Sequence, residues 1–243
     1  MKYLIGVDFG GSSSKATLLG EDGRVYATAV REYPTYYPHN GWAEQDAQDS
    51  YDAAVSNIRD LLQQTGAAPG DIAALALDAA THTAVLLGAD DRPVRRAIYW
   101  TDIRSTAQAE ELKETYGEEI IRESYNTVSS LWTLPQLRWL AQNEPDTLKK
   151  TRKLMAMKDY VRFRMTGDYV TDGIEAMGFL LLDAKQNKWS PLLCSLAGID
   201  PDILPPIVDP MTSLSPLCRQ AQADTGLTDA TLVIAGATDT SME

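Results

Sequence analysis

The first apolar runs of the chain are short and predict strands. They cover residues 3–7, 16–19 and 25–30 and are separated by polar residues. Runs of this length are typical of strands rather than helices. Asp22-Gly23 lies between the second and third runs, and this dipeptide favours a tight hairpin turn. The pattern therefore predicts three consecutive strands joined by short connections.

A helix and a buried strand are predicted next. Apolar positions at helical spacing follow Asp46 and Asp49, either of which can cap the helix, and Gly66 ends it. These positions are Tyr51, Ala54, Val55, Ile58, Leu61 and Leu62. Residues 72–77 are almost continuously apolar, as in a strand buried on both faces. This order of elements predicts an α/β fold in which helices cover a sheet.

Similar patterns continue to the end of the chain. Further strands are predicted at residues 83–87, 94–100, 153–157 and 231–235, and further helices at residues 106–116 (with Ser105 as cap and Gly117 as stop), 118–125, 136–141, 158–167 and 216–225. The last strand leads through small residues to Asp239, much as the first strand leads to Asp8. We therefore expect residues 1–230 to form one domain and residues 231–243 to begin a second one that continues beyond Glu243.

The connection between the first two strands carries candidate chemistry. It contains the carboxylate of Asp8, the small residues Gly10, Gly11 and Ser12, and the ammonium group of Lys15. Unobstructed backbone amides and hydroxyls suit a phosphate group. A single carboxylate beside phosphates suits Mg²⁺. The alternative is a serine-rich hairpin tip without a ligand.

Two common phosphate-binding loops do not fit this segment. A P-loop needs glycine before its lysine, Ser or Thr after it, and then a helix. Lys15 is instead flanked by Ser14 and Ala16, and a strand follows. The dinucleotide fingerprint needs a Gly-x-Gly-x-x-Gly spacing that opens a helix, and Gly10-Gly11 lacks both the spacing and the helix.

Polar residues follow the buried strand at 72–77. The segment from Asp78 to Thr81 and His82 lies where open α/β sheets bind ligands, at the carboxyl end of a strand. His82 is either a ligand-binding residue or a core histidine bonded to a backbone carbonyl. The other histidine, His39, lies in a strip rich in proline and tyrosine and is expected to be a solvated loop residue.

Composition narrows the classes of protein. The chain has 243 residues, of which 44% are hydrophobic, enough for one large or two small domains. A net charge of −12 argues against a nucleic-acid or polybasic membrane-binding surface. No apolar run approaches the ~20 residues of a membrane span, and no signal-peptide pattern is present. Cys194 and Cys218 lack CxxC spacing, so both are expected to be reduced thiols in a cytoplasmic protein.

An ordered set of motifs resembles the FGGY carbohydrate kinases, and within them the xylulokinase branch. The motifs are Gly6–Lys15, Gly41–Asp46, Thr81-His82, Ala97–Arg104, Lys158–Gly167, Leu182-Asp183 with Trp189-Ser190, and Ala235–Asp239. Each motif is weak alone, but they cover the whole chain in the family's order and with similar gaps.

The resemblance implies a fold and an activity. The fold would be an actin/hexokinase-like (ribonuclease H-like) ATPase domain, a mixed sheet with an N-terminal β-hairpin and flanking helices. The activity would be transfer of a phosphoryl group from ATP, with Mg²⁺, to a hydroxyl of a ketose, with D-xylulose as the first candidate. The expected partners are the sugar and ATP, with no nucleic acid or membrane, and a homodimer is one possible assembly.

The resemblance also implies residue roles. Asp239 would be the catalytic base and would contact the sugar, together with Thr81 and His82. Asp8 would bind Mg²⁺. The residues around ATP would be Asp8, Gly10, Gly11, Ser12 and Lys15.

Departures from the family pattern leave the sugar open. The family usually has threonine where this chain has Gly11, and xylulokinases have Gln-Met where it has Ala80-Thr81. The asparagine that commonly follows the base is Thr240. Ribulose, other ketoses, gluconate and polyols therefore stay as alternatives.

Two classes of protein other than a kinase stay as alternatives, a sugar-binding module and a hydrolase. A non-catalytic sugar-binding module would use Thr81 and His82 without needing Asp239. A hydrolase with paired carboxylates is a third hypothesis, whereas two histidines poorly support a triad or a multi-histidine metal site. Asp102 and Arg104 would either support the sugar or form a structural ion pair.

Overall fold

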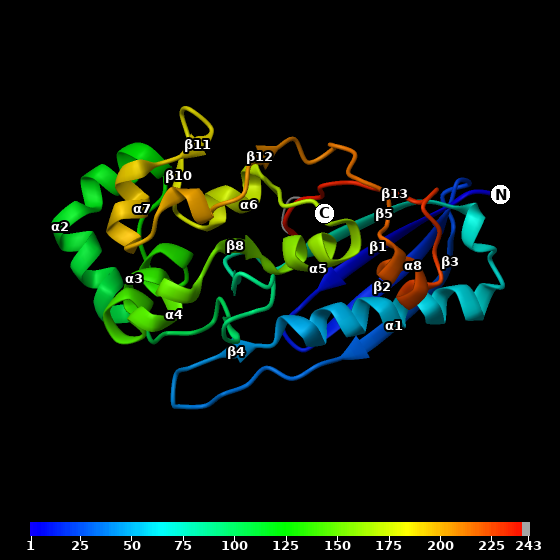
Figure 1. The fold of residues 1–243 in the computed structure, drawn as a ribbon, viewed down its shortest axis with the longest axis horizontal. Helices are drawn as coiled ribbons and strands as arrows, with labels where there is room; N and C mark the ends of the chain where they lie inside the picture. The colour runs from blue at the N-terminus through cyan, green and yellow to red at the C-terminus, as the bar shows by residue number, and fades with distance from the viewer. Residues whose placement is uncertain (240–243) are drawn as a thin grey trace.

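A mixed five-stranded sheet forms one end of the molecule (Figure 1). In this computed structural model, residues 1–239 are described. The strands lie in the order β13-β5-β1-β2-β3, with bounds β1 Tyr3–Phe9, β2 Ser13–Gly20, β3 Val25–Glu32, β5 Ile72–Ala79 and β13 Leu232–Val233. β1, β2 and β3 are antiparallel neighbours, whereas β5 runs parallel to both β1 and β13. The three predicted N-terminal strands and the buried strand after them are confirmed.

Helices cover one face of this sheet. Ile5, Val7 and Phe9 alternate along β1 and are almost fully buried against α1 (Ala47–Thr65) and its neighbours. The carboxylate of Asp46 accepts a hydrogen bond from the backbone of Gln48 and caps α1. The helix ends at Gly66, which has the positive φ expected at a C-terminal cap. α5 (Met157–Thr166) and α8 (Arg219–Thr225) pack beside α1.

A second hydrophobic core lies at the other end of the molecule, to the left in Figure 1. It packs against one face of a four-stranded sheet in the order β4-β7-β6-β8, and side chains on the other face of that sheet, such as Val85 and Met155, belong to the first core. The bounds are β4 Glu44–Gln45, β6 Ala84–Leu87, β7 Ala97–Ile98, β8 Lys153–Ala156, α2 Thr106–Ser124, α3 Thr133–Asn143, α4 Pro145–Lys150 and α7 Pro191–Ala197. Cys194 lies in α7, and both cysteines are free.

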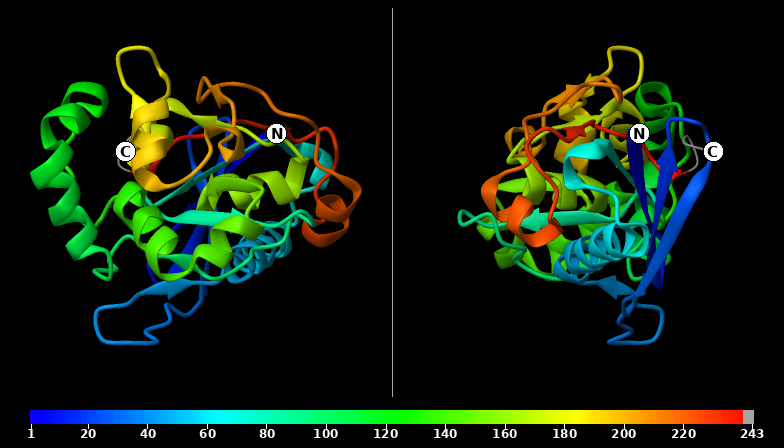
Figure 2. Two further views of the ribbon diagram at one scale, coloured as in Figure 1. Left: turned by 60° about the vertical axis from the view of Figure 1, so that its left-hand side comes forward. Right: turned by 90° about the vertical axis from the view of Figure 1, so that its right-hand side faces the viewer.

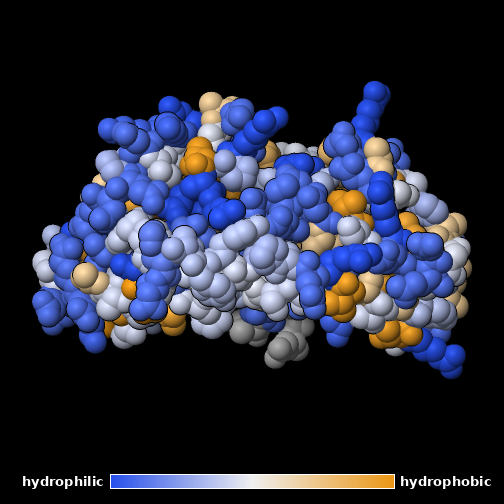
Figure 3. All heavy atoms as spheres, turned by 90° about the horizontal axis from the view of Figure 1, so that it is seen from below, coloured by the Kyte–Doolittle hydropathy of each residue, from blue (hydrophilic) through white to orange (hydrophobic). Residues whose placement is uncertain are grey.

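The remaining elements are short, and those between residues 171 and 208 are drawn in yellow to orange in the turned views of Figure 2. They are β9 Thr171–Asp172, α6 Gly173–Gly178, β10 Leu182–Asp183, β11 Lys188–Trp189, β12 Ile207–Val208 and two 3-10 turns, Pro69–Asp71 and Pro201–Ile203. Within residues 1–239, no helix combines the length and apolarity needed to cross a membrane. The face seen in Figure 3 is largely hydrophilic, with apolar side chains in small separate patches.

Some predicted elements differ in extent from those observed. The predicted strand at 94–100 is wrong in extent, because only Ala97–Ile98 pairs. Before it, Arg95 extends to the carboxylates of Glu44 and Glu144. The helices predicted at 106–116 and 118–125 are confirmed as two helical stretches joined end to end in α2, which has a kink with non-helical backbone at Tyr116. The second stretch buries Ile120 in the second core.

The C-terminal segment also departs from expectation. The helix predicted at 216–225 begins only at Arg219, where Cys218 precedes it as cap. The strand predicted at 231–235 pairs only over Leu232–Val233, and it extends the first sheet beside β5. The domain boundary at residue 230 stays a prediction, and Thr240 lies outside the described residues.

Candidate functional site

The strand register brings three charged residues together on the face opposite α1. Asp8 pairs with Lys15 across the β1–β2 hairpin and with Asp78 across the parallel β1–β5 pair. Side chains of directly paired residues point to the same face of a sheet. Because Val7 and Phe9 face the core, the Asp8 side chain faces away from it.

The loop after Asp8 has its carbonyl groups bonded to neighbouring side chains. The Tyr33 hydroxyl donates to the carbonyl of Gly10 at 2.6 Å, and the Thr35 hydroxyl donates to that of Gly11 at 2.5 Å. Within residues 1–239, no hydrogen bond donated by the amides of Gly11 or Ser12 is recorded. Backbone amides that donate no hydrogen bond within the protein can donate one to an oxygen of an anion. The loop therefore fits the predicted phosphate site.

Gly11 lies close to the Tyr99 side chain. A Cβ atom at this position would lie 3.0 Å from the hydroxyl oxygen of Tyr99, tighter than an ordinary contact. A larger residue at position 11 would therefore need the Tyr99 side chain to shift. Ser12 is exposed at the tip, while the carbonyl and hydroxyl of Ser14 accept bonds from the buried Asn57 side chain.

Asp78 lies near two other carboxylates, one from each end of the chain. Burial, then the neighbouring Asp8 and its hydrogen bond, and then Asp239 raise the pKa of Asp78 to about 7. Carboxylates raise one another's pKa only when they are close. Asp8 and Asp239 therefore both lie near the Asp78 side chain. The sequence pattern placed Asp78 at the end of a buried strand but indicated no role for its side chain.

His82 lies close to this cluster in a constrained conformation. Its backbone has φ 72°, a left-handed value that is uncommon outside glycine. Its Nδ1 lies 2.7 Å from the carbonyl oxygen of Gly178, and its ring lies 4.4 Å from that of Trp132. Nδ1 therefore carries the donated proton, which leaves Nε2 as an acceptor. Burial lowers the pKa of His82, so the ring is neutral near pH 7, although the carboxylate of Asp239 acts in the opposite direction.

The contact with Gly178 also fixes Thr81. A Cβ atom at residue 178 would lie 3.0 Å from the His82 Nδ1 and 3.4 Å from the Thr81 Cβ. Glycine at residue 178 thus allows α6 to approach the segment that follows β5. The carbonyl bond predicted for a core histidine is present, and it fixes the orientation of the ring.

Asp102 and Arg104 form a structural ion pair. The Arg104 guanidinium lies 2.8 Å from the Asp102 carboxylate, and both side chains are fully buried. Asp102 also accepts a hydrogen bond from the backbone of Ala43, and Arg104 stacks on the Trp42 ring. The pair therefore holds residues 41–45 in place. Of the two alternatives, support for the sugar and a structural ion pair, the structure shows the ion pair.

A buried charge network behind the site was not anticipated from the sequence. The Lys158 ammonium lies 2.7 Å from the carboxylates of both Asp159 and Asp172. Arg162 pairs with Asp159 at 2.9 Å and donates to the carbonyl of Ala235, shortly before Asp239. The network therefore ties α5 to the segment that carries the predicted base.

Glu175 is a buried acid beside this network. Its side chain is almost inaccessible, and neither carboxyl oxygen has a hydrogen-bond partner within residues 1–239. Burial raises its pKa to about 8 against the opposing effect of Lys158, and the nearby Asp159, Asp172 and Asp239 act in the same direction as burial. Glu175 is therefore protonated at neutral pH.

Replacing Glu175 with Gln is expected to remove a pH dependence of stability. A carboxyl whose pKa is raised on folding stabilises the native state below its unfolded pKa, and this stabilisation is lost as pH rises through the folded pKa. The free energy of unfolding of the wild type should thus fall relative to that of Glu175→Gln between pH ~4.5 and 8. Urea unfolding at several pH values measures this difference.

The exposed Glu114 on α2 supplies the matched control. The pH trend seen with Glu114→Gln is subtracted from that of Glu175→Gln. After this subtraction, the free energies of unfolding of the wild type and Glu175→Gln are compared. If their difference does not change with pH, Glu175 is already ionised in the native state.

The residues present fit a magnesium ion bound in part by phosphate. Residues 1–239 contain no cluster of three or more ligating side chains that could hold a metal alone. Asp8 and Asp78 are nevertheless adjacent, and Oδ1 of Asp78 is buried without a hydrogen-bond partner among the described residues. One or two carboxylates completed by water and phosphate oxygens is the usual environment of Mg²⁺.

Comparison with known proteins gives consistent matches over nearly the whole chain. The profile of the FGGY family of carbohydrate kinases, N-terminal domain, matches residues 3–243. A xylulose kinase of Bacillus subtilis is 35% identical over 239 residues, which is 98% of this chain and 48% of that protein. The chain spans about half the length of the curated relatives it matches.

Solved structures confirm the mixed α/β, actin/hexokinase-like fold class. Ligand-bound xylulose kinase from Lactobacillus acidophilus matches with a TM-score of 0.93 and 28% identity, over 98% of this chain and 48% of that one. Gluconate kinase from the same organism matches with the same score, identity and coverage. The folds therefore agree, although one of these proteins is a xylulose kinase and the other a gluconate kinase.

Proposed function

The chain belongs to the FGGY family of carbohydrate kinases, and from this premise we propose that it is part of an enzyme that transfers a phosphoryl group from ATP to a sugar hydroxyl. The observation that carries the proposal is the proximity of Asp8, Asp78 and Asp239 beside a loop with available amides. Phosphoryl transfer depends on positioning and charge neutralisation more than on covalent chemistry. A carboxylate cluster next to anion-binding amides suits that task.

The ATP phosphates are assigned to the loop between β1 and β2. The amides of Gly10, Gly11 and Ser12 line that loop, although the Gly10 amide already bonds to the carbonyl of Ser13. Lys15 is exposed opposite Asp8 and supplies a positive charge on the same face. Asp8, with Asp78 beside it, would hold Mg²⁺, which would supply the positive charge that neutralises the phosphates.

Asp239 is assigned the role of general base. As the sugar oxygen attacks the γ-phosphorus, its proton passes to the Asp239 carboxylate. The new oxygen–phosphorus bond forms while the bond from the γ-phosphorus to the bridging oxygen breaks, and ADP leaves. Closure of the enzyme around the reactants would exclude water and suppress ATP hydrolysis.

Thr81 and His82 are assigned to the sugar. Neutral His82 presents Nε2 as an acceptor for a sugar hydroxyl, because Nδ1 is bonded to the Gly178 carbonyl. D-xylulose is the first candidate, because several of the similar proteins are xylulose kinases. Gluconate is the second, since a gluconate kinase matches the fold equally well.

The remaining expectations concern the whole protein. We propose that residues 231–243 lead into a nucleotide-binding domain that supplies the adenine pocket. On that basis the 243-residue chain alone should be inactive or nearly so. A cytoplasmic location and a homodimer are consistent with the proposal and stay predictions.

The test is a coupled ADP-release assay of the full-length protein against a panel of ketoses, gluconate and polyols. We expect ADP formation that requires both Mg²⁺ and a sugar, fastest with one ketose. The dependence on sugar follows because the base acts on a substrate hydroxyl rather than on water.

Two results would contradict the kinase. Sugar binding in calorimetry without any ADP formation would favour a non-catalytic module. ADP release at the same rate with and without sugar would indicate an ATPase.

A further inference from the structure

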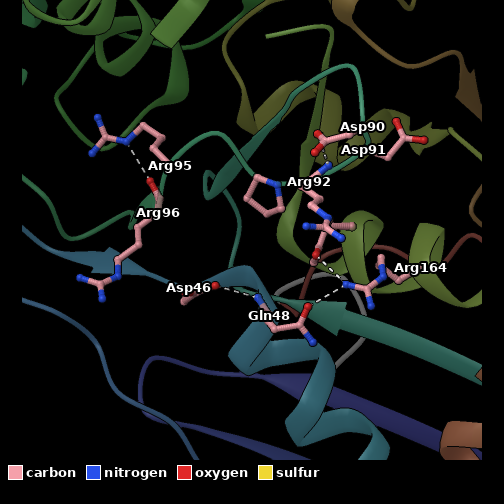
Figure 4. A pocket seen from close by; sticks show the side chains of 10 residues that line it. Asp46, Gln48, Asp90, Asp91, Arg92, Arg95, Arg96 and Arg164 are labelled. Carbon is pink, nitrogen blue, oxygen red and sulfur yellow. Dashed lines mark hydrogen bonds between the residues drawn. The ribbon is translucent and has the colours of Figure 1, made fainter. Parts of the chain in front are cut away.

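A pocket rich in arginine (Figure 4) has none of the residues proposed for catalysis in its lining. Its volume is about 640 Å³, which is large enough for a small metabolite. It is formed by the start of α1, the connection from β6 to β7, and α5. The lining residues are Asp46, Gln48, Asp90, Asp91, Arg92, Pro93, Arg95, Arg96, Tyr160 and Arg164.

Three of the four arginines have no ion pair with any residue in the range 1–239. Arg164 donates only to neutral oxygens, those of the Gln48 amide at 2.8 Å and the Tyr160 hydroxyl at 2.9 Å. Arg96 stacks on an aromatic ring at 3.6 Å, and Arg92 is exposed. Figure 4 shows Arg92 and Arg164 on one side of the pocket, near Gln48, and Arg96 on the other.

The acidic residues of the lining are bonded elsewhere. Asp46 caps α1, and Asp91 pairs with Lys153 at 2.6 Å. Asp90 accepts a hydrogen bond from the backbone of Arg92. Among the described residues, Arg95 pairs with Glu44 and Glu144, whereas the guanidinium groups of Arg92, Arg96 and Arg164 form no ion pair, in a chain whose net charge is −12.

We propose that this pocket is a second, non-catalytic site that binds a phosphorylated small metabolite. Guanidinium groups offer paired N–H donors that match the oxygens of a phosphate monoester. The volume exceeds that of phosphate alone, and the polar lining suits an attached sugar or polyol. The shared chemistry is a phosphate dianion, from either free phosphate or its ester.

The position of the pocket connects it to the catalytic segment. α5 presents Tyr160 and Arg164 to the pocket. On its buried side the same helix carries Arg162, which donates to the carbonyl of Ala235 shortly before Asp239. A ligand in the pocket would therefore contact the helix that holds this segment.

Calorimetric titration of the full-length protein tests the proposal. The probes are ribose 5-phosphate, inorganic phosphate and unphosphorylated ribose. We expect ribose 5-phosphate to bind, ribose not to compete with it, and the double variant Arg92→Gln/Arg164→Gln to weaken binding at least tenfold. The single Arg92→Gln variant serves as well if the double variant does not fold, because Arg92 is exposed.

Two controls separate this site from other anion sites. Arg24→Gln removes an exposed arginine on the β2–β3 turn, and Ser12→Ala alters the proposed ATP loop. Both should bind ribose 5-phosphate as the wild type does. No binding to the wild type, equal affinity in the double variant, or an equal loss in Ser12→Ala would overturn the proposal. Inorganic phosphate that binds as tightly as its ester would identify free phosphate as the ligand.

Discussion

Replacing Asp239 with Asn is expected to lower kcat for sugar-dependent ADP formation by about 10²–10⁴-fold. Asparagine keeps the size of the side chain but cannot accept the proton of the attacking hydroxyl. The affinity for ATP should change little, because the phosphates are assigned to the loop after Asp8. Steady-state kinetics of the full-length protein at saturating sugar measure the effect.

Asp229→Asn provides the control, since Asp229 is an exposed carboxylate in the same C-terminal part of the chain. It should retain wild-type kcat. If Asp239→Asn stays within threefold of the wild type, the base lies elsewhere, and Asp78 would be the next residue to replace because its pKa is already raised to about 7.

Local patterns in the sequence predicted the N-terminal strands of the first sheet and the position of the loop after Asp8. The short apolar runs at 16–19 and 25–30 and the turn at Asp22-Gly23 predicted the hairpin of β2 and β3 without any tertiary information. The runs at 3–7 and 16–19 likewise placed the polar loop after Asp8 between two strands, β1 and β2. The strand predicted at 94–100 was too long, because its pairing with β4 and β6 is a non-local effect and covers only Ala97–Ile98.

Asp78, Glu175 and the arginine pocket were not predicted from the sequence. Their significance depends on which elements pack together, and the spacing of apolar residues does not contain that information. Asp78 becomes part of the cluster only through the register of β5 against β1. Glu175 is recognised only once α6 is packed beside Lys158. The arginine pocket likewise joins α1, α5 and the β6–β7 connection, which are far apart in the sequence.

Replacing Lys158 with Met is expected to lower the free energy of unfolding by about 3–5 kcal/mol, because it leaves buried carboxylates without their cation. Asp159 and Asp172 both lie 2.7 Å from the ammonium group, and all three side chains are fully buried. Burial alone would lower the pKa of Lys158, but Asp159, Glu175 and Asp172 raise it above its usual value, so the charge is present in the native state. Urea denaturation followed by circular dichroism measures the loss.

The same substitution at Lys149 isolates the contribution of burial. Lys149 also forms an ion pair, with Asp146 at 3.0 Å, but both side chains are largely exposed. Lys149→Met should therefore change the free energy of unfolding by no more than about 1 kcal/mol. Equal losses in the two variants would mean that the Lys158 network is solvated. A selective loss would support α5 as the element that holds the Ala235 carbonyl, and with it the approach to Asp239, in place.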